Sequence, residues 1–491
     1  MHDASEPATH SPAHSATTAQ VRPGPPATDA LSAVGRALDA IGLNRAHKLI
    51  LLMVLLGAFF DVMEENSLGA VGPALKDVWS LSTTELAFLQ TVTISAMIIG
   101  KVVTGVIGDY KGRRFALAFN LFLYCAGALI CATAPGYAVL ALGRFVVGIG
   151  LGGEMAAGMT MLSELVPTRF RGAMVASLNV GAGGLGNMLS FGFAALVLGP
   201  LGNFFGGPET SWRWMFGLLV IPAVLVVLYR RYLPETPRYL ASRGRVDEAN
   251  QVLTRLASGR LKDTGAKVVE YVPLSAGAAA GPQKVRLSEV FHGRLLRRTA
   301  ALAVASWMSF GAQVTVLVLM PTILVDQGYS ITKSLTFTMV MNVGSLLGAA
   351  AATYAAAHWP RRLVTTAGAL AACLTALTFG FLAHGSALIL LLGGLFQFFV
   401  LMLNSTIFAW APELYPTRIR AFGTAMIAVQ GNIAGALVPL GAGLLLDSSG
   451  VVAVFGVIAV MYAVMAAAAR LAPETFGKRL EDINSEPVQT A

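Results

Sequence analysis

Charged side chains are scarce in this sequence. Asp, Glu, Lys and Arg make up 12% of its 491 residues, whereas globular proteins carry about 25%. Apolar residues make up 55%, and the mean hydropathy is +0.67. The apolar residues recur in blocks of about 20, the length at which a helix crosses a bilayer. A soluble enzyme is therefore excluded as the default interpretation, and a polytopic membrane protein is predicted.

Cysteine is also scarce, and signatures of catalysis or cofactor binding are missing. Cys125, Cys131 and Cys373 lie in apolar runs without CxxC or metal-ligand spacing, so we expect buried thiols and no disulfide. The glycine-rich runs at 148–153 and 181–186 lack the preceding strand and the following Lys-Ser or Lys-Thr of a phosphate-binding loop. We predict no enzyme activity, no metal and no cofactor, and we interpret these glycines as sites of close helix packing.

The N-terminus lacks the apolar segment of a signal peptide. The first 28 residues are rich in Ala, Ser, Thr, Pro and His, which predicts a disordered tail. Leu31, Val34, Leu38 and Ile41 follow at helical spacing. Residues 1–45 are therefore predicted to form a cytoplasmic tail with a short amphipathic helix on the inner membrane surface.

Long apolar runs, in contrast, are abundant. Twelve membrane spans can be marked, at about 48–72, 86–108, 115–134, 137–163, 172–198, 214–232, 299–324, 335–357, 363–383, 386–410, 421–445 and 450–471. Within the polar segment between spans six and seven, residues 239–257 have a helical pattern. The predicted organisation is an N-terminal six-helix bundle, a cytoplasmic loop with helices, a C-terminal six-helix bundle and a cytoplasmic tail, at 46–232, 233–298, 299–472 and 473–491.

Positive charges are unevenly distributed between the loops. If both termini are cytoplasmic, the tails and the loops on that side hold 30 of the 35 Lys and Arg residues. Cytoplasmic loops of membrane proteins carry this excess. The pattern therefore predicts a multi-pass protein of the inner or plasma membrane with both termini in the cytoplasm. The net charge of +9 then matches the anionic inner leaflet and gives no reason to expect nucleic acid.

The two predicted halves carry similar motifs. The second span ends in Gly-Val-Ile-Gly-Asp-Tyr-Lys-Gly-Arg-Arg at 105–114. The fourth ends in Glu-Leu-Val-Pro-Thr-Arg-Phe-Arg at 164–171, and the tenth in Glu-Leu-Tyr-Pro-Thr-Arg-Ile-Arg at 413–420. Repeated halves are typical of secondary transporters, whose binding site lies near the midplane between the repeats.

With these motifs the chain resembles the major facilitator superfamily over roughly residues 45–482. Pro-Glu-Thr-Pro-Arg-Tyr-Leu from Pro234 and Pro-Glu-Thr-Phe-Gly from Pro473 are similar to the signatures of its sugar-porter and metabolite:proton symporter branches. Asp-Val-Met-Glu at 61–64 resembles the Asp-Gly-x-Asp motif of aromatic-acid:proton symporters, with Glu64 in place of the second Asp. The resemblance implies an all-α membrane protein with twelve transmembrane helices in two pseudo-symmetric six-helix bundles. We expect a monomer that works by alternating access.

The first span carries three carboxyl groups where an apolar helix is expected. Asp61, Glu64 and Glu65 share one helical face at i, i+3 and i+4 spacing. A charge in the bilayer core costs at least about 2.5–3.5 kcal/mol, so these acids are functional candidates. At about 1.5 Å of rise per residue, Arg144 of the fourth span reaches the same depth, so we predict that it faces Asp61 or Glu64. This set is our candidate for proton coupling, and a static ion pair between two helices is the alternative.

Further candidates are predicted to bind substrate. Lys101 of the second span and Glu154 of the fourth lie at similar depths, where they could form an ion pair or contact a carboxylate substrate. Polar residues in other spans complete the set: Gln90, Asn187, Trp307, Gln313 and Asn404. Each of these alone is more often an interhelical hydrogen bond than a ligand contact.

Charged side chains gather at the predicted cytoplasmic ends of the spans. We predict a gate whose salt bridges hold that side shut and break when it opens, with orientation by positive charge as the alternative. Its members are Asp109, Gly112, Arg113, Arg114, Glu164, Arg169, Arg171, Glu235, Arg238, Glu413, Arg418 and Arg420. In the second half, Ala357 and Pro360 stand where Asp and Gly would be, so Arg361 and Arg362 are expected to matter less.

These features predict a secondary active transporter that imports a small organic anion, an aromatic or other carboxylate metabolite, by proton symport. Three alternatives stay open: a sugar or polyol transporter, a proton-coupled efflux pump, and a non-transporting sensor on the same scaffold. The glutamine-rich pattern of sugar porters in spans five and seven is missing, which weakens the first alternative. The Gly-Pro motif of drug:proton antiporters in span five is missing as well, which weakens the second.

Overall fold

A computed structural model describes residues 30–261, 267–273, 291–383, 385–415 and 419–477. Eleven helical segments of this part of the chain are long and apolar enough to cross a membrane. The predicted N-terminal disorder and Arg418 lie outside the described residues.

The first half of the chain contains α1 (Ala30–Ile41), α2 (Arg45–Trp79), α3 (Thr83–Lys111), α4 (Arg113–Ala132), α5 (Tyr137–Leu165), α6 (Thr168–Leu178), the π-helix η1 (Asn179–Gly186), α7 (Asn187–Leu198), α8 (Pro208–Leu218) and α9 (Ala223–Tyr232). It is followed by α10 (Pro237–Ser242) and α11 (Val246–Ala257). The second half contains α12 (Gly293–Asp326), α13 (Ile331–His358), α14 (Arg361–Leu382), α15 (Ser386–Trp410), the 3-10 helix η3 (Ala411–Leu414) and α16 (Arg420–Leu471).

Local sequence sets several of these boundaries. Asn44 caps α2, since its side chain accepts from the Ala46 amide. Ser82 and Glu85 form a reciprocal capping box at the start of α3. Gly450 interrupts α16 with φ = +77°, a left-handed conformation that glycine adopts without strain.

The break at Gly450 reconciles the eleven long segments with twelve crossings. Asp447, just before the break, meets Thr84 at the start of α3, whereas Arg470 lies beside Arg362 at the start of α14. The polypeptide of α16 therefore crosses the bundle once in each direction, as spans eleven and twelve were predicted to do. Span five is the continuous series α6, η1 and α7, and span six comprises α8 and α9.

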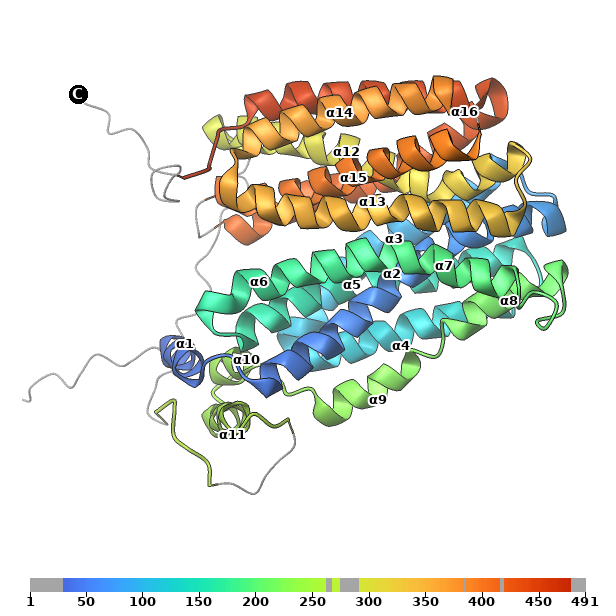
Figure 1. Cartoon of the computed structure of the whole chain (residues 1–491). Coiled ribbons are helices and arrows are strands. Elements are labelled where there is room, and N and C mark those ends of the chain that lie inside the picture. Colours follow the sequence, from blue (N-terminus) through green and yellow to red (C-terminus); the bar gives the residue numbers. More distant parts are fainter. Residues whose placement is uncertain (1–29, 262–266, 274–290, 384, 416–418, 478–491) are drawn as a thin grey trace, which may run out of the picture.

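The helices form two groups that lie side by side (Figure 1). The groups meet where α2 packs on α12, α3 on α16, and η1 and α7 on α13. The glycines of span five permit close approach, because a Cβ on Gly184 would lie 3.0 Å from the Cα of Leu346. The exact limits of the two bundles stay a prediction.

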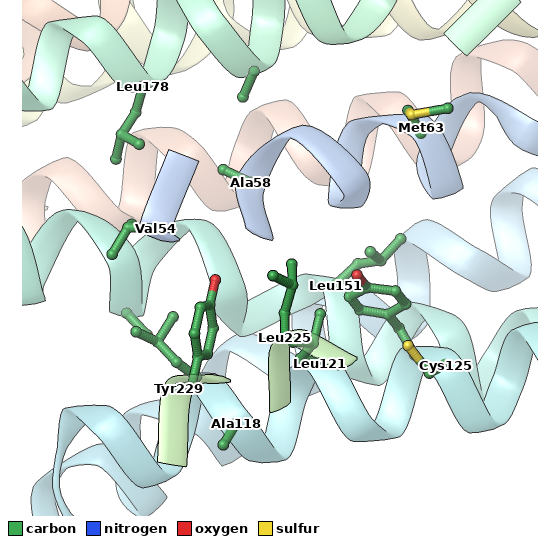
Figure 2. Close-up of a cluster of buried hydrophobic side chains, with 14 of the residues drawn as sticks. Val54, Ala58, Met63, Ala118, Leu121, Cys125, Leu151, Leu178, Leu225 and Tyr229 are labelled. Atoms are coloured by element: carbon green, nitrogen blue, oxygen red, sulfur yellow. The ribbon is translucent and has the colours of Figure 1, made fainter. Parts of the chain in front are cut away.

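Each group is held together by its own apolar core. Figure 2 shows part of the first core, in which Val54 and Ala58 of α2 face Leu121 and Leu225 from α4 and α9. Tyr229 rises from α9 with its hydroxyl group toward α2, where it donates to the Met53 carbonyl at 3.0 Å.

The segments outside the spans form short helices. The amphipathic helix α1, whose place on the membrane surface stays a prediction, packs its apolar face on α6, α10 and α11. Asp39 ties it there by accepting from the Thr168 amide at 2.6 Å. The helical pattern at 239–257 is split between α10 and α11, because Gly244 turns the chain with φ = +73°.

Candidate functional site

The acidic face predicted for the first span lies in the middle of α2. Glu64 is completely buried and Asp61 is 6% exposed, while Glu65 is half-buried. The helix surrounds them with small or apolar residues, so these carboxyl groups have few neighbours that could solvate a charge.

Arg144 of α5 pairs with Glu64. Its Nη1 lies 3.0 Å from Glu64 Oε1, and both side chains are completely buried. The same nitrogen donates to Ser67 Oγ at 3.1 Å, and Nε donates to Thr93 Oγ1 at 3.0 Å. The prediction that Arg144 faces Asp61 or Glu64 is thus resolved in favour of Glu64. The hydrogen bonds fix the guanidinium group from α2 and α3 together.

Asp61 and Glu154 lack such a partner. All four of their carboxyl oxygens are buried, and none has a hydrogen-bond partner among the described residues. Each carboxyl group is nevertheless close enough to the other for direct Coulomb interaction. The first half therefore buries one paired and two unpaired acids in addition to Glu65.

The predicted ion pair between Lys101 and Glu154 is not formed. A Cβ placed on Gly57 would lie 2.8 Å from Glu154 Oε1, so the Glu154 carboxyl group lies against α2. Lys101 instead lines a cavity of about 110 Å³ between α3, α4 and α5, and its electrostatic partner is Glu65. Depth alone suggested the pair, but the two side chains leave their helices on different faces.

The neutral candidates fall into two groups. Asn404 of α15 donates its amide to Gln313 Oε1 of α12 in the second half. In the first half, Asn66 donates to Asn187 Oδ1 at 2.8 Å and thereby joins α2 to α7. Gln90 is buried with its Oε1 unpartnered among the described residues, which leaves it free for a ligand.

Trp307 of α12 is half-buried, so part of its ring is accessible. It lies in the middle part of the helix that carries Gln313, with the two positions less than two turns apart. The structure joins Gln313 and Asn404 by a hydrogen bond.

The predicted gate of the first half is a connected network at the end of the bundle that carries α10, termed here the α10 end. Arg113 Nη2 lies 3.2 Å from Glu164 Oε1, and Thr236 donates to Glu164 Oε2 at 2.5 Å. Glu235 accepts the backbone amides of Arg113 at 2.9 Å and Arg114 at 3.2 Å. These bonds join α4, α5 and the segment before α10.

Gly112 is required in this network. Its φ is +97°, and a Cβ there would collide with the Glu235 carboxylate. Burial raises the pKa of Glu235, while the amides of Thr236, Arg113 and Arg114 oppose that shift by donating to the ionised form. Asp109 adds an ion pair to Arg113 at 3.4 Å, although its side chain is mostly exposed.

The second half repeats this network, contrary to the expectation that it is degraded. Arg361 Nη2 lies 3.1 Å from Glu413 Oε1, and Thr475 donates to Glu413 Oε2 at 2.5 Å. Glu474 accepts the backbone amides of Arg361 and Arg362, each at 2.9 Å. The bonds need only a backbone amide and an arginine at these positions, so Pro360 and Ala357 do not prevent them.

The other gate candidates lie around these networks. Arg238 of α10 is an electrostatic neighbour of Arg171 and Glu164. Arg169 lies over the ring of Phe170, and Arg420 donates to the Tyr415 carbonyl at 3.4 Å.

The two networks at the α10 end each join residues of the same half. Bonds between the halves are found at the opposite end, where Lys76 of α2 meets Asp326 of α12 at 3.0 Å. Thr84 Oγ1 donates to Asp447 Oδ2 at 3.0 Å in the same region. The halves are therefore latched together at the end remote from α10, whereas the ion pairs of Arg113 and Arg361 each stay within one half.

Several members of these sites were missed in the sequence. Ser67 and Thr93 hold Arg144, but single hydroxyl residues in a span carry no distinctive signal. Glu474 and Thr475 could have been found, because they occupy the Pro-Glu-Thr motif that repeats Glu235 and Thr236.

The sequence matches the sugar (and other) transporter family over residues 53–486. The chain belongs to this family. The niacin transporter NiaP of Acinetobacter baylyi is 29% identical over 448 residues, covering 91% of this chain and 98% of that protein. The inner membrane metabolite transport protein YdjE of Escherichia coli is 30% identical over 440 residues, covering 87% and 93%.

The fold is also found in a solved structure. The inward open conformation of the xylose transporter XylE from E. coli matches with a TM-score of 0.69 at 19% identity, covering 89% of this chain and 99% of that chain. The resemblance to the major facilitator superfamily is thus confirmed. The protein is a multi-pass secondary transporter of a small molecule, as the sequence predicted.

Proposed function

We propose that this transporter imports a small organic anion, an aromatic or other carboxylate metabolite, together with protons. The observation that carries the proposal is the buried Arg144–Glu64 pair beside the unpartnered Asp61. A buried acid without a cation is costly as a carboxylate and is relieved by a proton. An acid that is paired in one conformation and unpaired in another can therefore carry a proton across the membrane.

The orientation of the protein in the membrane supports import as the direction of transport. The α10 end holds most of the Lys and Arg residues outside the spans, so we assign it and both termini to the cytoplasm. The latches at the opposite end then close the external side, and the conformation is inward-facing. Protons and substrate would enter when these latches open and leave when they close.

Charge and the relatives support a carboxylate substrate. Lys101 lines a cavity on the cytoplasmic side of the acidic face, where a cation attracts an anion before release. NiaP transports niacin according to its name, and niacin is a pyridine carboxylic acid. We assign Gln313, Asn404 and Trp307 to recognition of the uncharged part of the substrate, with Gln90 and Asn187 as further contacts from the first half.

A sugar or polyol is the second candidate substrate. The amide pair of Gln313 and Asn404 favours it, because neutral amides suit hydroxyl groups. A carboxylate needs Lys101 and a sugar does not, so Lys101→Gln separates the two candidates.

The test uses purified protein in proteoliposomes with radiolabelled nicotinate, benzoate or xylose. We expect one of the carboxylates to accumulate when the outside is acidic, and an uncoupler to abolish that accumulation. Asp61→Asn and Glu64→Gln should lose accumulation and retain exchange of substrate across the membrane. Normal pH-driven uptake in both variants would contradict the proposal.

A further inference from the structure

Glu154 occupies a position that the proposed transport cycle has not used. Its side chain leaves α5 and reaches α2 at Gly57, one turn before Asp61. A Cβ at Gly57 would lie 2.8 Å from Glu154 Oε1 and would collide with the Tyr229 hydroxyl group. The absence of a side chain at Gly57 therefore makes room for the Glu154 carboxyl group beside Asp61.

The two carboxyl groups are enclosed from several sides. Glu154 is 2% exposed and Asp61 is 6% exposed. Tyr124 of α4 and Tyr229 of α9 are further electrostatic neighbours of both acids. The Tyr229 hydroxyl group donates its hydrogen bond to the Met53 carbonyl, whereas the Tyr124 hydroxyl group has no hydrogen-bond partner among the described residues.

The nearby cations pair with other acids. Arg144 directs its Nη1 and Nε to Glu64, Ser67 and Thr93, its Nη2 has no hydrogen-bond partner among the described residues, and Lys101 lies with Glu65. No hydrogen bond or ion pair of the described residues reaches the oxygens of Asp61 or Glu154. Two adjacent carboxylates in this environment would repel each other without solvation, and one proton shared between them removes that repulsion and leaves a single negative charge spread over both groups.

We propose that Asp61 and Glu154 form a carboxyl pair that binds the transported proton between them. The pair rests on the proposed proton symport and refines it. Glu154 becomes a proton-binding residue rather than a substrate ligand or the partner of Lys101. The Arg144–Glu64 pair beside it stays a separate unit, which sets the electrostatic field around the proton.

This arrangement predicts how the pair changes in transport. Asp61 belongs to α2, which packs on α12 of the other half, whereas Glu154 belongs to α5 and lies within the first half. A shift of α2 against α5 would separate the two acids and release the proton. In this conformation they are adjacent, so the proton stays bound until that shift occurs.

The first experiment detects the shared proton directly. Infrared difference spectra of the purified protein in lipid are recorded between acidic and alkaline pH for wild type, Asp61→Asn, Glu154→Gln and the double variant. We expect a carboxylic acid carbonyl band in wild type that each single variant removes or shifts, with no further loss in the double variant. Bands that disappear additively would show two independent acids and overturn the pair.

The second experiment measures coupling in proteoliposomes. Glu154→Gln should reduce nicotinate accumulation driven by an acidic exterior at least about tenfold, the effect of about 1.4 kcal/mol, while exchange at equal pH persists. Glu209→Gln, an exposed glutamate at the start of α8, is the matched control and should behave as wild type. Equal loss of accumulation and exchange in Glu154→Gln, with a lowered melting temperature, would assign Glu154 a packing role and overturn the proposal.

Failure of the symport proposal can be told apart from failure of the pair. If wild type shows no proton-driven accumulation of any tested substrate, symport is wrong. The infrared spectra still decide whether Asp61 and Glu154 share a proton in that case. If wild type is coupled and Glu154→Gln is coupled normally, symport stands and the pair is wrong.

Discussion

In the first half, the interior of the bundle encloses charged side chains from α2, α3 and α5, whereas the described spans of the second half place neutral amides at comparable depth. The charged set is Asp61, Glu64, Glu65, Lys101, Arg144 and Glu154, and the neutral set is Gln313, Asn342, Gln397, Asn404 and Asn432. At the α10 end the two halves instead share the same bonds from arginine to glutamate and from glutamate to backbone amides.

This difference reflects two requirements of a transporter, which are to hold the helices of each half together and to bind the transported species. The ends of both halves must hold the same helices together while the halves rock, so the same network serves twice. In the proposed symport, proton chemistry is needed once in each cycle, and a second buried charge cluster would only add desolvation cost. We infer that the first half couples transport to protons and that the second half contributes most of the specificity.

The largest loss of stability is expected from removing the Arg144 side chain. Arg144→Ala leaves Glu64 fully buried without its cation, which costs about 3–5 kcal/mol. Asn404→Ala in the other half loses one neutral hydrogen bond and should cost about 1 kcal/mol. Melting temperatures of the two purified variants test this contrast between the halves.

The double variant Arg144→Gln with Glu64→Gln sharpens the result. It removes both charges and should recover much of the lost stability while accumulation driven by protons stays abolished. A melting temperature of Arg144→Ala equal to that of Asn404→Ala would show that the charged core carries no special stability.

The sequence predicted these features unequally, for physical reasons. Span length and depth located Arg144 and Glu64 at the same level, and any arginine there must find an acid. Depth does not fix the rotation of a helix about its axis, so the pairing of Lys101 with Glu154 was wrong. The second network was underestimated because the comparison was made at Ala357 and Pro360, whereas the bonds come from Glu474 of the repeated Pro-Glu-Thr motif to backbone amides.

Substitutions at the α10 end, where the two halves share the same network, are expected to have an intermediate effect on the transport rate. Arg113→Ala and Arg361→Ala each remove one partly buried bond to a glutamate and one to a backbone carbonyl, of Gly108 and Ala356 respectively. We expect both to reduce the transport rate by similar factors. Initial uptake rates at matched protein density measure this.

Asp109 provides the only bond in this comparison that the second half lacks, because Ala357 stands in its place. Asp109→Ala should have a smaller effect than either arginine variant, since an exposed ion pair contributes at most about 1 kcal/mol. Wild-type rates in Arg361→Ala, together with a large loss in Arg113→Ala, would restore the interpretation that the second network is degraded.

The smallest effect is expected from breaking the ion pair between the two halves, and it concerns how often the external end opens. Lys76 and Asp326 are 30% and 45% exposed, so their ion pair at the end remote from α10 is worth at most about 1 kcal/mol. Lys76→Ala should therefore raise the population with an open external end by no more than about fivefold. The rate at which a membrane-impermeant maleimide labels Thr322→Cys, a buried position beside Gly72, reports that opening.

Exchanging the charges, Lys76→Asp with Asp326→Lys, should return the labelling rate to its original value. If the exchanged pair labels as fast as Lys76→Ala, the closed external end depends on packing of α2 on α12 rather than on the charges of this pair.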